Sequence, residues 1–181
     1  MNSEQAEARY VVSFDQVGVE DIASVGGKNA SLGELTKIGM PVPPGFALTV
    51  RFYREFLNRN GLQQYIKDQL VNLDISNVEQ LQKVGRSIRS KIVASEFPSE
   101  LKEQIKQGYW SLGRGIDVQV AVRSSATAED LADTSFAGQQ DTYLHVIGEA
   151  RILESAKNAS HHYSLIERSV TEPNEDSTIW M

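Results

Sequence analysis

One arginine and the small polar residues that follow it are the part of this sequence best suited to chemistry. From Val118 to Arg123 valines alternate with other residues, which predicts a pleated, half-buried strand. Ser124 to Thr127 then read as a loop of small and hydroxylated residues. Such a loop offers backbone N–H groups and hydroxyls, and Arg123 adds a fixed cation at its base. Donors that converge at a strand end suit an anionic ligand such as a phosphate.

Two acidic residues downstream leave a structural alternative for this arginine. An ion pair between Arg123 and either Glu129 or Asp130 is as good an interpretation as a ligand contact, because a buried guanidinium needs a partner. The two carboxylates could instead bind a metal ion, but such a site needs further oxygen ligands that the spacing does not identify. We therefore expect them to cap or solvate the loop, and we assign no metal ligand.

A second cationic position lies near the start of the chain, at Gly26-Gly27-Lys28. Two glycines ahead of a predicted helix let the backbone approach a ligand, and the helix N-terminus favours an anion. The spacing matches neither a Walker A loop nor the dinucleotide-binding fingerprint. On these residues alone, a glycine turn with a solvated lysine is the favoured interpretation.

A third segment of small residues leads into the second strand of the same region. Gly138 lets the backbone approach a ligand, and Thr142 offers a hydroxyl group. An ordinary hairpin with one glycine in its turn is the alternative. We treat His145, His161 and His162 as structural or incidental, because adjacent histidines on a helix diverge by about 100° and chelate poorly.

The elements that must position these residues predict an α+β fold in which strands frame a helical middle. Periodicity and turn residues predict strands over 10–17, 46–50, 118–123 and 142–146. Helices are predicted over 29–38, 51–59, 62–73 and 149–159, and two more begin at the capping-box pattern Ser76-x-x-Glu79 and at Pro98-Ser99. The helix that begins near Ser76 should bury Val78, Leu81, Val84, Ile88 and Ile92. The helix that begins at Pro98-Ser99 should bury Leu101, Ile105, Tyr109 and Leu112.

The composition of the whole chain excludes several classes of protein. Its 181 residues suffice for one domain with a sizeable core, and 40% hydrophobic with 23% charged residues is typical of soluble globular proteins. No apolar run reaches the roughly 18–20 residues of a membrane span. A net charge of −6 gives no general attraction to nucleic acid or to a membrane surface. Cysteine is absent, which excludes disulfides and a thiol nucleophile and fits the cytoplasmic location that we expect.

Four segments resemble one protein family in their order and spacing. They are VGGKNASLGEL (25–35), VPPGFALT (42–49), VAVRSSATAEDL (120–131) and SFAGQQDTYLHV (135–146). The set is similar to the start of the ATP-binding domain that phosphoenolpyruvate synthase (pyruvate, water dikinase) shares with pyruvate phosphate dikinase and rifampicin phosphotransferase. The resemblance covers residues 1–147 and implies the N-terminal portion of an ATP-grasp nucleotide-binding domain.

The resemblance also implies roles for individual residues. Lys28 and Arg123 would hold the phosphates of ATP and offset charge on the transferring group. Gly138 and Thr142 would line the nucleotide pocket. No catalytic residue is implied in this chain, because in such enzymes ATP phosphorylates a histidine on a separate swivelling domain. Mg²⁺ is expected in the full-length family, with its ligands outside this chain.

The end of the chain departs from the family pattern after residue 147. Residues 148–181 are expected to form a divergent, poorly ordered tail, in which 149–159 could be helical and the polar, acidic stretch around Pro173 is frayed or disordered. We therefore expect a fragment of a phosphoenolpyruvate-synthase-like enzyme that supplies part of an ATP site and is inactive alone. The parent reaction would convert ATP, pyruvate and water to AMP, phosphoenolpyruvate and phosphate, and pyruvate would bind only through domains absent here.

Three alternatives to this hypothesis stay open at the level of the sequence. The parent enzyme could be a rifampicin phosphotransferase, which the segment at 135–146 does not distinguish from the synthase. The chain could instead be a stand-alone nucleotide-binding or regulatory module that pairs with a separately encoded second lobe. A truncated product without activity is the third alternative.

Overall fold

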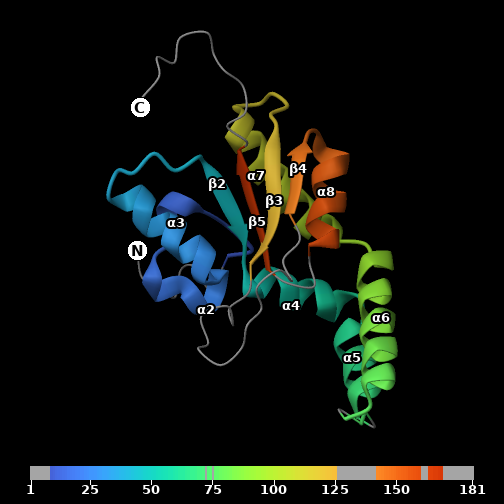
Figure 1. The fold of residues 1–181 in the computed structure, drawn as a ribbon. Coiled ribbons are helices and arrows are strands. Elements are labelled where there is room, and N and C mark those ends of the chain that lie inside the picture. The colour runs from blue at the N-terminus through green and yellow to red at the C-terminus, as the bar shows by residue number, and fades with distance from the viewer. Residues whose placement is uncertain (1–8, 72, 75, 126–141, 160–162, 169–181) are drawn as a thin grey trace.

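A five-stranded antiparallel sheet lies at the centre of the computed structural model, which describes residues 9–71, 73–74, 76–125, 142–159 and 163–168 (Figure 1). The strands are β1 (Val11–Ser13), β2 (Gly45–Leu48), β3 (Val120–Ser125), β4 (Thr142–Val146) and β5 (Tyr163–Arg168). Their order across the sheet is β1-β2-β5-β3-β4. Because β5 is antiparallel to both of its neighbours, β2 and β3 run in the same direction and end at the same edge of the sheet.

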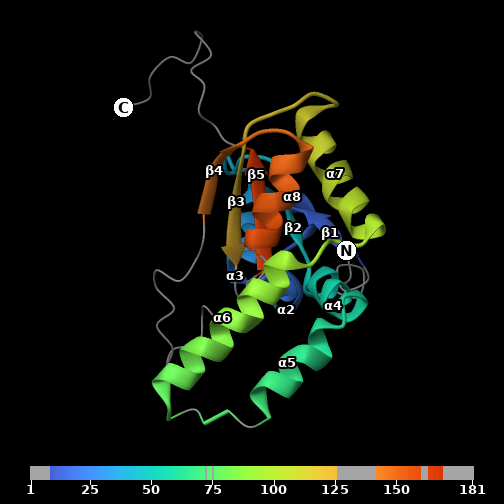
Figure 2. The ribbon, with the colours of Figure 1, turned by 90° about the vertical axis from the view of Figure 1, so that its right-hand side faces the viewer.

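Helices cover both faces of this sheet, which confirms the expected α+β class (Figure 2). On one face lie two short 3-10 turns, η1 (Phe14–Gln16) and η2 (Val19–Asp21), with helices α2 (Ile22–Val25) and α3 (Gly27–Lys37). The other face carries α4 (Val50–Arg59), α7 (Ser99–Gly113) and α8 (Glu149–Asn158). The pair α5 (Leu62–Leu70) and α6 (Val78–Ala94) extends away from the sheet in both views.

The alternation of side chains along the strands divides the core into two unequal parts. Phe46 and Leu48 of β2 point into the larger core, whereas Ala47 between them points into the smaller one. The larger core contains the aromatic residues Phe52, Phe56, Phe97 and Tyr109. The smaller core consists of Val12, Val17, Val25, Ala30 and Ala47. Large side chains therefore fill the α4/α7/α8 side, and small ones fill the side under α2 and α3.

Strand β3 is more deeply buried and longer at its C-terminal end than expected. Val120 and Val122 are fully buried in the larger core, and Ala121 on the opposite face is buried too. The prediction of a half-buried strand was therefore wrong, because helices pack on both faces of the sheet. The predicted loop also begins later, since Ser124 and Ser125 still belong to β3 and pair with β5.

Helix α6 differs from its prediction in both its cap and its buried face. It begins after Asn77, whose side-chain oxygen accepts a hydrogen bond from Gln80 N at 3.0 Å, so the capping box at Ser76 was wrong. Val78 is 63% exposed, and of the five apolar residues expected inside only Ile92 is fully buried. The reason is that α6 projects beyond the sheet. None of the described helices is both long enough and apolar enough to cross a membrane.

Two elements follow residue 147, at which a domain boundary was predicted. Helix α8 matches the helix expected over 149–159, and Ile152 and Ala156 on it are buried in the larger core. Strand β5 was not predicted, and it pairs with strands on both sides. The boundary itself stays a prediction, and residues 169–181 lie outside the described residues.

The fully buried hydroxyl of Tyr109 connects α7 to the residues just before β3 and just before α8. It donates a hydrogen bond to Val118 O at 2.8 Å, with Asp117 Oδ1 as a second acceptor at 3.2 Å, and it accepts from Val118 N at 3.0 Å and from Gly148 N at 2.9 Å. One donor and two acceptor positions are what a phenol offers, so its capacity is used. The prediction that Leu101, Ile105 and Tyr109 point inward is confirmed.

Replacing Tyr109 by phenylalanine should lower the free energy of unfolding by at least about 2 kcal/mol. The change keeps the ring but leaves the backbone groups of Val118 and Gly148 without their hydrogen-bond partner. Urea unfolding of both variants measures this, with Tyr65→Phe as the control, because among the described residues the Tyr65 hydroxyl forms a hydrogen bond only with the Ser87 hydroxyl, which is partly buried. Equal losses in the two variants would contradict the role given to Tyr109.

Candidate functional site

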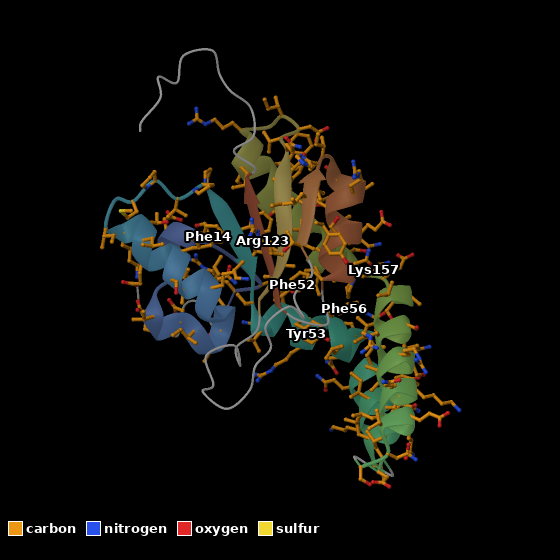
Figure 3. All side chains as sticks on the ribbon, viewed as in Figure 1. Phe14, Phe52, Tyr53, Phe56, Arg123 and Lys157 are labelled. Atoms are coloured by element: carbon orange, nitrogen blue, oxygen red, sulfur yellow. The ribbon has the colours of Figure 1, made fainter. Side chains whose placement is uncertain are left out.

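Arg123 lies on the face of the sheet that α2 and α3 cover. Residues paired directly across antiparallel strands point to the same face. Ala47 of β2 pairs with Leu165 of β5, and Leu165 pairs in turn with Arg123. Since Ala47 packs with Val25 of α2 in the smaller core, the Arg123 side chain belongs to that face. Figure 3 shows Arg123 on the sheet toward the side of α3 and Phe14.

Thr142 is the direct cross-strand partner of Arg123. The two residues pair in the antiparallel register of β3 and β4, and both therefore point to the α2/α3 face. Arg123 is partly buried, and its Nε atom is inaccessible to solvent. Thr142 is exposed on the edge strand β4. A partly desolvated guanidinium beside an open hydroxyl gives an anion a stronger interaction than either group would give in water.

Lys28 is the second residue of α3, the helix that contacts β3 on this same face. Gly26 before the helix has φ 83° and ψ 158°, a conformation that glycine adopts without strain. The first N–H groups of α3 have no acceptor inside the helix, and their dipoles favour an anion near Lys28. The fold thus brings Lys28, Arg123 and Thr142 to one face.

Gly33 allows α3 to pack tightly against the segment between β1 and η2. A Cβ atom at this position would lie 2.1 Å from Val17 O and 2.9 Å from Phe14 O, both of which are backbone atoms. Only a residue without a side chain fits at that spacing. The close contact fixes the height of α3 above the sheet, and with it the position of Lys28.

Ion pairs hold the opposite end of the same helix. Lys37 Nζ lies 3.0 Å from Glu34 Oε1 and 3.5 Å from Glu20 Oε1. The hydrogen bond with Glu34 is the main reason why the pKa of Lys37 is raised, and a backbone hydrogen bond is the main reason why the pKa of Glu20 is lowered. Both groups are exposed, so these pairs orient α3 more than they stabilise the fold.

Asn29, the residue after Lys28, was not predicted to belong to the site. Asn29 is fully buried, and its Nδ2 donates to Val25 O at 2.5 Å. Its Oδ1 atom is buried without a hydrogen-bond partner in the described part of the chain. Such an acceptor is rare in native proteins and often marks a site where a ligand or water completes the structure. The only signal in the sequence is an amide in the first turn of a predicted helix.

Several predicted residues lie outside the described residues. They are Gly138, which was expected to line the pocket, and Glu129 and Asp130, the alternative partners of Arg123. Within the residues that the structure does describe, no group of three or more histidine, aspartate or glutamate side chains could hold a metal ion. The described site is therefore cationic and hydroxylated, with the chemistry of an anion-binding surface.

Comparison with known proteins shows that the residues of this surface lie in the range that matches a nucleotide-binding domain family. Residues 22–169 match the family described as "Pyruvate phosphate dikinase, AMP/ATP-binding domain". That range includes α3, β3, β4 and β5, which together carry Lys28, Arg123 and Thr142.

Individual relatives are similar over most of the chain. A phosphoenolpyruvate synthase from Pseudomonas aeruginosa is 49% identical over 153 residues, which cover 82% of this chain and 19% of the relative. A probable phosphoenolpyruvate synthase from Methanothermobacter thermautotrophicus is 44% identical over 81% of this chain and 22% of its own length. The phosphoenolpyruvate synthase from Escherichia coli is 42% identical over 86% of this chain and 20% of its own length. The chain thus spans about a fifth of the length of the curated relatives it matches.

Replacing Gly33 by alanine should destabilise the protein by about 1–3 kcal/mol, because the added methyl group forces α3 away from the backbone of Val17. Gly85→Ala in α6 is the matched control, since its Cβ would meet only the flexible end of Arg89. That change should instead stabilise by about 0.5–1 kcal/mol through helix propensity. Thermal unfolding measures the change in melting temperature of both variants. A change of the same sign in the two variants would contradict the close packing of α3 at Gly33.

Proposed function

Because the chain belongs to the family of pyruvate phosphate dikinase AMP/ATP-binding domains, we propose that it forms one wall of an ATP site. Lys28, Arg123 and Thr142 make up the described part of this wall. Gly138, which lies outside the described residues, would belong to the same wall through its neighbour strand β4. The observation that carries the proposal is the direct pairing of Arg123 with Thr142 on the face covered by α3.

Each group of the wall has a distinct task with the polyphosphate. The planar guanidinium of Arg123 presents two parallel N–H donors to one phosphate, and its partial burial reduces screening by water. Lys28 supplies a mobile point charge that follows the phosphate chain from the first turn of α3. Thr142 offers a hydroxyl to the sugar or to a phosphate oxygen. All of these interactions strengthen as negative charge develops on the transferring group, which is how positioned cations assist phosphoryl transfer.

We propose further that the fold is the N-terminal lobe of an ATP-grasp domain, with the nucleotide between this lobe and a second one. The second wall, the phosphorylated histidine and the acceptor site would come from the parts of the relatives that this chain does not span. Mg²⁺ would bind with the nucleotide phosphates, since the described residues offer no cluster of acidic ligands. The parent reaction would be that of phosphoenolpyruvate synthase, the name that the relatives carry.

Replacing Arg123 by alanine should weaken ATP binding by about 1.5–3 kcal/mol, which is ten-fold or more in the dissociation constant. Titrations followed by NMR suit the weak binding expected of one wall. Arg151→Ala is the matched control, because Arg151 is exposed on α8 at the opposite face of the sheet. Arg123→Lys should bind with intermediate affinity, since it keeps the charge but loses the fork of donors. If Arg123→Ala melts like the wild type and binds ATP equally well, Arg123 lies outside the site.

The 181-residue chain alone should not transfer a phosphoryl group to pyruvate. The phosphorylated histidine and the acceptor site are proposed to come from the parts of the relatives that this chain does not span. Incubation with γ-labelled ATP, Mg²⁺ and pyruvate, followed by separation of the labelled products, measures this directly. Phosphoenolpyruvate formed by the chain alone would contradict the proposal that it supplies only one wall.

A further inference from the structure

Helices α5 and α6 form a hairpin, residues 62–94, that extends away from the sheet (Figures 1 and 2). Two contacts of Tyr65 on α5 hold the helices together: its hydroxyl shares a hydrogen bond with the Ser87 hydroxyl at 2.7 Å, and Lys91 Nζ lies 5.9 Å from the centre of its ring. Helix α6 also contacts α8, and Ile92 near its end is buried in the larger core. The hairpin is thus a supported projection, and a partner binds it without the cost of ordering it.

One side of α6 carries a stripe of exposed residues. Consecutive residues turn by about 100° around a helix, so residues three or four apart share a face. The exposed residues on one such face of α6, which we call the outer stripe, are Val78, Glu79, Gln82, Arg86, Arg89 and Val93. Val78 is 63% exposed and Val93 is 37% exposed, so an apolar group lies at each end of the stripe. Arginines beside exposed apolar groups are typical of protein–protein interfaces.

Charge is divided along the length of the hairpin. All of its acidic residues lie at the tip, where α5 ends and α6 begins, and they are Asp68, Asp74 and Glu79. All but one of its basic residues lie further along α6, and they are Lys83, Arg86, Arg89 and Lys91. Glu79, Arg86 and Arg89 form no ion pair with any residue that the structure describes. The hairpin therefore presents a negative tip and a positive shaft to a partner.

A second copy of the same hairpin, running antiparallel to the first, fits this division of charge. In a pair related by a twofold axis the same surface serves both copies, and every contact occurs twice. The register that places Glu79 opposite Arg89 of the second copy also places Gln82 opposite its Arg86. The same register brings Val78 within one helical turn of Val93 of the second copy. A parallel pair would instead place acids beside acids and arginines beside arginines, which costs free energy.

Partners of a single charge fit the hairpin less well. Nucleic acid or an anionic lipid surface would match the arginines of the shaft, but the acidic tip would repel it. A cationic partner would match the tip and would be repelled by the shaft. The net charge of −6 on the whole chain adds to the repulsion of polyanions. A surface with both signs at opposite ends, as on the hairpin itself, satisfies both parts.

We propose that two copies of this chain associate through an antiparallel contact of their outer stripes, with Glu79 of each copy paired to Arg89 of the other. Helix α6 has 17 residues and is therefore about 25 Å long. One helix face from each copy is at the small end of interfaces that persist in solution, so the dimer is reversible, with a dissociation constant in the micromolar range. This inference uses none of the residues proposed to bind ATP, and it stands whether or not the chain binds a nucleotide.

Sedimentation equilibrium of the whole chain at low ionic strength tests the association. The average mass should rise from 20.1 kDa toward twice that value as the concentration increases. Val78→Ser should weaken the dimer about five-fold or more, because it removes an apolar group from each copy's stripe. Val19→Ser is the matched control, since Val19 on η2 is 60% exposed and lies outside the hairpin. A monomer mass up to a concentration of about 1 mM would overturn the proposal, and so would equal effects of the two variants.

A charge exchange tests the antiparallel register itself. Glu79→Arg and Arg89→Glu should each weaken association about ten-fold or more, because each variant alone brings like charges together twice. An equimolar mixture of the two variants should regain most of the affinity of the wild type, since each reversed charge then meets an opposite one. Both residues are exposed, so the melting temperatures should change little. The proposal is overturned if the single variants associate like the wild type, or if the mixture associates no better than either variant.

Discussion

The backbone pairing of β5 between β2 and β3 is the interaction on which the rest of the structure depends. It joins three segments that are far apart in the sequence, and it fixes their register residue by residue. Side chains alternate along a strand, so a slip of one position would turn all of β3 over. Arg123 would then point into the aromatic core, where an unpaired guanidinium is costly, and Val122 would lose its burial. The pairing therefore selects the face on which the cation lies.

The two faces of the sheet differ in a way that suits this placement. Aromatic side chains fill the space under α4 and α7, with the rings of Phe52, Phe56 and Phe97 in edge contacts. The α2/α3 side holds only small apolar groups, and Gly33 lets α3 approach the backbone below it. Because this core is small, it does not cover the whole face of the sheet. Polar groups lie at the end that it leaves uncovered: Arg123, Thr142 and the first turn of α3. The aromatic core and the residues proposed to bind the nucleotide thus lie on opposite faces of one sheet.

Elements whose formation depends on neighbouring residues in the sequence were predicted from local patterns. The position and burial of the other elements depend on contacts between distant parts of the chain. The spacing of Leu101, Ile105 and Tyr109 identified the buried face of α7, and Gly39, with φ 79°, follows the end of α3 as predicted. The apolar stripe of α6 has the same periodicity, yet Val78 and Leu81 at its start are exposed and only Ile92 is fully buried, because α6 contacts α5 and α8 and projects beyond the sheet. Strand β5 carries no distinctive pattern, since its place is set by the two strands beside it. Among the proposed site residues, Arg123 and Lys28 could be selected from the sequence, but that Thr142 lies opposite Arg123 depends on the register.

The central claim is that the α2/α3 face, at the end that carries Arg123, binds the phosphates of a nucleotide. Mapping the backbone amide shifts that ATP induces in the ¹⁵N-labelled chain tests it most directly. We expect the largest shifts at the start of α3 and at the paired ends of β3 and β4, around Lys28, Arg123 and Thr142. Shifts centred on α7 and α8, or on the projecting pair α5 and α6, would contradict it.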